Sequence, residues 1–171
     1  MNFKHLLKKA ALMASMAVVA ASLAACQPKT IADQIDTLER LVKDDAKTLS
    51  RLEAKTFAQL KNDFFACDSM LQYLHPEQVE ENFQQLQLIG AYLEQFKATQ
   101  GTLRADIDST LGQLGRLKAD VESHYLSDSL AAIYLDDETQ HAILINNQVG
   151  YFKDRLTTCQ KDLEAMKKQM K

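Results

Sequence analysis

The stretch IADQIDTLERLV, residues 31–42, sets the pattern on which the rest of the chain is built. Large apolar side chains recur in it at Ile31, Ile35, Leu38 and Val42. Steps of three and four residues place these side chains on one face of a helix. The spacing continues to residue 74, although Asp45 stands where an apolar residue is due. An isolated amphipathic helix of this length needs partners to bury its face, so the pattern predicts a helical bundle.

Two local signals shape this first helix. Between Leu52 and Leu60 the apolar spacing becomes two successive steps of four through Thr56, a stutter that locally unwinds a coiled coil. At the other end, His75-Pro76 predicts a stop, because the residue before a proline is pushed out of the helical region. Pro76 itself suits the first turn of a new helix.

Two further helices are expected. The predicted spans are 31–74, 77–125 and 128–170. The second span contains Gly90, Gly101, Gly112 and Gly115, each costing about 1 kcal/mol relative to alanine, and a kink or break is favoured at 99–102. The apolar face of the third span is marked by Leu130, Ile133, Leu144, Tyr151, Phe152, Leu156, Cys159, Leu163, Met166 and Met170, with Tyr151 expected on its outer side.

The composition agrees with an all-α fold. The chain has five glycines, two prolines and no tryptophan, and it shows neither alternating β-branched runs nor an Asn-Gly hairpin signal. Short turns between long helices make sequential helices antiparallel neighbours. We therefore predict one domain, residues 31–171, folded as an up-down-up three-helix antiparallel bundle with the shape of a coiled-coil-like rod.

The first 25 residues have the organisation of an export signal: a basic start, an apolar run over 10–21 and small residues before a cysteine. The apolar run is shorter than the roughly 20 residues that span a bilayer. Leu23-Ala24-Ala25-Cys26 resembles the lipobox of bacterial lipoproteins. The resemblance implies that Cys26 receives a diacylglyceryl group, that residues 1–25 are removed, and that 26–30 become a lipidated tether. An ordinary cleaved signal or an uncleaved helix is the alternative.

Localisation follows from the same resemblance. Gln27, rather than aspartate, follows the cysteine, which resembles outer-membrane sorting in enterobacterial lipoproteins. We therefore expect a protein lipid-anchored in the outer membrane and facing the periplasm, with the cell surface or the inner membrane as alternatives.

Charge narrows the class of partner. Removing residues 1–25 takes away three lysines and no acids, leaving 17 basic and 23 acidic residues and a net charge of −6. An acidic chain without a basic stripe argues against nucleic acid and against electrostatic binding to anionic lipid. Contact with the membrane is therefore assigned to the lipid on Cys26.

Two cysteines remain after export, Cys67 and Cys159, both on predicted apolar faces. An oxidising compartment favours disulfides, so we predict an intramolecular bond between them. Tight turns would stagger the two residues by about ten positions, or ~15 Å, so the bond requires slack in the second helix or after residue 127. Two buried thiols, or a cross-link between chains, remain open.

Candidate reactive sites are few. Glu138-Thr139-Gln140-His141 has the Glu-x-x-His spacing of di-iron bundles, but the second such motif that those sites need is missing. His141 is better interpreted as part of a polar layer that fixes helix register, and Asn146-Asn147-Gln148 as a second hydrogen-bonded layer or a solvent face. No metal, cofactor or catalytic residue is assigned. Phe65 and Tyr151 are predicted to point outward as possible contact aromatics.

The favoured function is that of a cell-envelope lipoprotein with a structural or protein-interaction role, binding an envelope protein, with self-association possible. The alternative is a bundle that binds lipid, a small molecule or a chaperone client in a groove between helices. An enzyme is not expected, because no catalytic constellation stands out.

Overall fold

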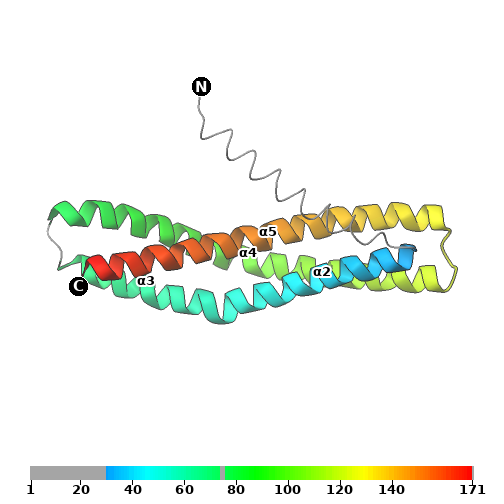
Figure 1. Cartoon of the computed structure of the whole chain (residues 1–171), viewed down its shortest axis with the longest axis horizontal. Helices are drawn as coiled ribbons and strands as arrows, with labels where there is room; N and C mark the ends of the chain where they lie inside the picture. The colour runs from blue at the N-terminus through cyan, green and yellow to red at the C-terminus, as the bar shows by residue number, and fades with distance from the viewer. Residues whose placement is uncertain (1–29, 74–75, 171) are drawn as a thin grey trace, which may run out of the picture.

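The computed structural model of the protein describes residues 30–73 and 76–170, without the side chains of 76–78. The predicted signal segment, the lipobox-like stretch and Cys26 lie outside the described residues. Five helical elements follow in the described part of the chain: α2 (Ile31–Arg51), η1 (Leu52–Phe57), α3 (Ala58–Leu71), α4 (Pro76–Glu122) and α5 (Asp128–Gln169). Since α2, η1 and α3 follow one another directly, they form one arm, and the predicted three-helix up-down-up bundle is confirmed (Figure 1).

The first arm begins with a capping box. The Thr30 hydroxyl accepts from the Asp33 backbone N–H at 3.1 Å, and the Asp33 carboxylate accepts from the Thr30 backbone N–H at 3.1 Å. Two orphan backbone donors are thereby satisfied, which fixes the start of α2 directly after the expected tether.

The stutter predicted from the sequence becomes the π-helical element η1. A π turn inserts one extra residue into the helix, which shifts the apolar face back into register. As a result Leu49, Leu52 and Leu60 are all buried in the same core. At this level Phe57 of η1, Phe96 of α4 and Phe152 of α5 form an aromatic layer, with ring centroids 5.3 and 5.2 Å apart.

The expected break at residues 99–102 is wrong, because α4 is one unbroken helix from Pro76 to Glu122. Gly101 and Gly115 face open space, so that a Cβ atom at either position would meet no other group within 4 Å. Burial of Phe96, Leu103 and Ile107 on the opposite face outweighs the ~1 kcal/mol that each exposed glycine costs the helix.

The end of α4 is a Schellman turn. The Tyr125 N–H donates to Asp120 O at 2.9 Å and the His124 N–H donates to Val121 O at 3.1 Å. His124 occupies the left-handed position with φ 55, which glycine usually fills. Ser127 then caps α5, its hydroxyl accepting from the Leu130 N–H at 3.4 Å.

The core is a single apolar seam along the whole rod. On α5 the buried positions include Ala131, Leu135, Glu138, Ala142, Ile145 and Val149, at steps of three and four. The assignment of Leu130, Ile133 and Leu144 to this face is therefore wrong: they are 38, 59 and 63% exposed. Ala131 and Ala142 occupy core positions beside Leu135 and Ile145, whereas Leu130, Ile133 and Leu144 stand off this step pattern and point outward.

Candidate functional site

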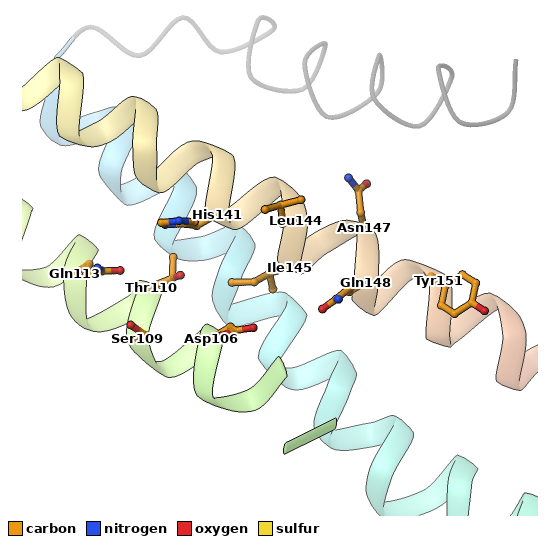
Figure 2. A pocket seen from close by; sticks show the side chains of 10 residues that line it. All are labelled: Asp106, Ser109, Thr110, Gln113, His141, Leu144, Ile145, Asn147, Gln148 and Tyr151. Atoms are coloured by element: carbon orange, nitrogen blue, oxygen red, sulfur yellow. The ribbon is translucent and has the colours of Figure 1, made fainter. Parts of the chain in front are cut away.

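A groove of about 580 Å³ runs between α4 and α5 in the half of the rod nearer the α4–α5 turn (Figure 2). We call it the α4–α5 groove. Its walls are Asp106, Ser109, Thr110 and Gln113 from α4, and His141, Leu144, Ile145, Asn147, Gln148 and Tyr151 from α5. The groove is partly open to solvent, and it combines polar side chains with the exposed Leu144 and Tyr151. Such a surface is suited to contact with another molecule rather than to enclosure of a small one.

Helical spacing places these side chains along the groove. His141, Leu144, Gln148 and Tyr151 follow one another at steps of three and four, as do Asp106, Ser109 and Gln113. Figure 2 shows the two rows on facing sides of the groove. Two rows at this spacing match the periodicity with which a helix from another molecule would pack between them.

A buried carboxylate, Glu138, lies next to Gln113 and His141 at the α4–α5 turn end of the groove. Glu138 is 8% exposed, and with its amide nitrogen turned toward this residue Gln113 donates to both carboxylate oxygens at 3.2 Å. Burial raises the pKa of Glu138, and the nearby His141 opposes that rise. The His141 Nδ1 lies 3.8 Å from Glu138 Oε2 while the ring itself is largely exposed. The polar layer expected at His141 is therefore centred on Glu138 instead.

A second polar layer joins α2 to α5. Asn146 Nδ2 donates to both carboxylate oxygens of the buried Asp45, at 3.0 and 3.2 Å. Burial raises the pKa of Asp45 to about 6, although the hydrogen bond from Asn146 lowers it. The hydrogen-bonded interpretation of Asn146 is thus confirmed, and the irregular position of Asp45 has its partner. Because the pair fits only one alignment of α2 and α5, it fixes their register.

The outward ring of Tyr151 contacts side chains of both α4 and α5. Its hydroxyl donates to Gln95 Oε1 at 3.3 Å, and the Arg155 guanidinium lies over Tyr151 and over Tyr92, 5.4 and 5.0 Å from the ring centres. These contacts hold an exposed aromatic in a fixed position, as cation–π pairs do. Tyr151 is 38% exposed, so the predicted outward orientation is confirmed.

Phe65 also points outward as predicted, with 53% exposure, while the ring of Phe64 packs edge-on against it. Phe65 lies on α3 and does not line the α4–α5 groove. The two candidate contact aromatics therefore belong to different surfaces.

The predicted disulfide is not present: Cys67 and Cys159 are free and buried. The Cys67 thiol approaches Leu163 O at 3.9 Å, so it lies about one turn beyond Cys159 along α5. The expected stagger of ten residues was too large because Phe64 contacts Gly90, which means that α4 extends roughly two turns past the end of α3 (Figure 1). Burial raises the pKa of both thiols, that of Cys159 to about 11.

The groove also brings Asp106, Ser109 and His141, the residue types of a charge-relay triad, to one surface. In the part of the chain that the structure describes, no hydrogen bond joins these three side chains to one another. Across residues 30–73 and 76–170, no group of three or more His, Cys, Asp or Glu side chains could hold a metal ion. Among the described helices, none combines the length and the apolar character needed to cross a bilayer.

Comparison with known proteins gave no match to any family model, any curated protein or any solved structure. Sequence reasoning did not single out Gln113, considered Glu138 only within the Glu-x-x-His motif, and assigned Leu144 to the core face. An unbroken step pattern from Ala131 through Glu138 to Ile145 was the signal that could have found the buried glutamate and exposed Leu144.

Proposed function

We propose that the protein is a lipid-anchored cell-envelope lipoprotein whose helical rod binds an envelope protein along the α4–α5 groove. The lipobox at Leu23-Ala24-Ala25-Cys26 supports the anchor, and the capped start of α2 at Thr30 leaves only a short tether between the lipid and the rod. The proposed compartment is the periplasmic side of the outer membrane, and the proposed role is binding rather than catalysis.

One observation carries the interaction role. Leu144 is 63% exposed beside Tyr151 on the wall of a groove whose side chains repeat at helical spacing. A solvated helix face has no need of a large aliphatic side chain between polar neighbours, whereas a contact surface gains from burying one. The partner best suited to this groove is an amphipathic helix that covers Leu144 and hydrogen-bonds to the polar side chains beside it.

Site-specific photo-cross-linking in intact cells tests this assignment. A photoreactive residue replaces Leu144 in one strain and Lys43, an exposed position on α2, in the control strain. We expect one envelope protein to be captured at position 144 and not at position 43. Self-linked products alone, or the same products at both positions, would contradict binding at the groove.

A second candidate function is binding of a small amphiphile, because the groove volume lies within the range of ligand sites, about 300–1,000 Å³. This function requires that amphiphiles raise the melting temperature of the delipidated protein and that Leu144→Gln abolishes the rise. A melting temperature that stays constant across such ligands would eliminate it.

A further inference from the structure

The rod exposes large apolar side chains toward both ends, and we consider those at the α4–α5 turn end. Tyr125 lies in the α4–α5 turn and is 81% exposed, and Leu130, Ile133 and Tyr134 in the first two turns of α5 are 38, 59 and 46% exposed. We call these four residues the tip cluster. None of them lines the α4–α5 groove, so the proposed protein contact does not account for them.

The tip cluster lies at the end of the rod where the lipidated tether would join. Asp36 of α2 accepts a hydrogen bond from Lys118 of α4 at 2.6 Å, which ties the start of α2 to the end of α4. Helices α2 and α5 run in the same direction, and Asp45 is level with Asn146. Counting back from that pair places Ile31 level with Ala132, beside Ile133. Figure 1 shows the start of α2 and the α4–α5 turn at the same end.

The length of the tether limits how far this end can be from the bilayer. If Cys26 is lipidated, as the proposed function holds, the segment from Cys26 to the capped Thr30 spans at most about 18 Å. The tip cluster therefore lies within reach of the headgroup region, where tyrosine is favoured because its ring is apolar and its hydroxyl is polar.

The charged residues near the tip cluster indicate which kind of lipid headgroup it would contact. The chain has no lysine or arginine between Lys118 and Lys153. Acidic side chains occur near the cluster at Asp120, Glu122, Asp128, Asp136, Asp137 and Glu138. Apart from Lys29 in the tether, the charges near the cluster are acidic and oppose attraction to anionic headgroups. Asp136 and Asp137, about one turn beyond Ile133, limit the depth of burial.

We infer that the tip cluster inserts into the interfacial region of the bilayer that holds the lipid anchor, so that the rod leans onto the α5 side instead of standing freely on its tether. This inference rests on the proposed function, since it needs the anchor at Cys26. The occupant of the cluster is a zwitterionic lipid surface.

Tryptophan quenching by brominated phosphatidylcholine tests the inference. The chain lacks tryptophan, so one introduced residue reports alone. The test variant is Tyr125→Trp, and the matched control is Tyr73→Trp, at a position 86% exposed beyond the end of α3 at the other end of the rod. Both are made in the full chain, purified with its lipid from bacterial membranes and reconstituted into vesicles, and intact mass is used to verify the lipid on Cys26.

We expect the Tyr125→Trp chain to lose most of its emission in brominated vesicles and the Tyr73→Trp chain to lose little. Adding Ile133→Asp or anionic phosphatidylglycerol should reduce the quenching at position 125. Lipidated protein with equally weak quenching at both positions would overturn the inference and leave the proposed function standing. Protein purified without lipid on Cys26 would overturn the proposed function, and the inference with it.

Discussion

Replacement of Asp45 by asparagine should stabilise the protein at neutral pH. The carboxylate is 6% exposed, and burial raises its pKa to about 6 from 3.8 in the unfolded chain. Each unit of pKa difference is worth 1.36 kcal/mol, so the charged form costs about 2 to 3 kcal/mol of folding free energy at pH 7.5. Asparagine has nearly the same shape, carries no charge and can still hydrogen-bond to Asn146.

The pH dependence gives the sign of the effect. Because the folded pKa exceeds the unfolded one, the native state binds more protons between about pH 4 and 6. The contribution of Asp45 to stability is therefore most favourable below the unfolded pKa and is lost as the pH rises through about 6. The Asp45→Asn chain should exceed the wild type in unfolding free energy by about 2 to 3 kcal/mol at pH 7.5 and match it near pH 3.5.

Urea unfolding monitored by circular dichroism at several pH values measures this difference. The control is Asp44→Asn, whose neighbouring carboxylate is exposed and has its pKa lowered by a hydrogen bond from Lys47. Removing that charge should give no gain at any pH. An Asp45→Asn chain that is less stable than the wild type at pH 7.5 would refute the argument, since the charged carboxylate would then be net stabilising.

Three further outcomes follow from the same structure. Phe96→Ala should cost about 3–5 kcal/mol by denaturant unfolding, because Phe96 is fully buried in the aromatic layer, and a smaller loss would mean that the three arms do not meet there. His124→Gly should raise stability by about 0.5–1 kcal/mol, because glycine adopts the left-handed conformation without strain, whereas a loss would contradict the Schellman geometry. Without reductant, Cys67 and Cys159 should react slowly with an alkylating reagent in the folded protein and completely after unfolding, and failure of both to react in urea would indicate a disulfide.

The sequence predicted the features that repeat. Steps of three and four residues indicated each helical arm, and the two steps of four around Thr56 became the π-helical element η1. The helical arms and the stutter could be predicted because each depends on spacing within one helix. The sequence also marked Asp45 as a polar interruption and Asn146 as a possible polar layer, but their pairing across α2 and α5 was not predicted.

The predictions that were wrong depend on how the three helical arms are aligned against one another. On α5, hydrophobicity favoured Ile133 and Leu144 as core residues, but the buried step pattern runs through Ala131 and Ala142 instead. The stagger between Cys67 and Cys159 was overestimated because the sequence does not show how far α4 extends past α3. The α4–α5 groove was out of reach for the same reason: neither wall is distinctive until the two helices are aligned.

The intact mass of the protein extracted from the membrane fraction of its own cells tests the central claim most directly. The account predicts a chain that begins at Cys26 and carries the added mass of a diacylglyceryl group, with a Cys26→Ser chain recovered without that mass. A wild-type chain cleaved elsewhere without lipid, or one that retains residues 1–25, would contradict the lipid anchor and the membrane contact inferred for the tip cluster.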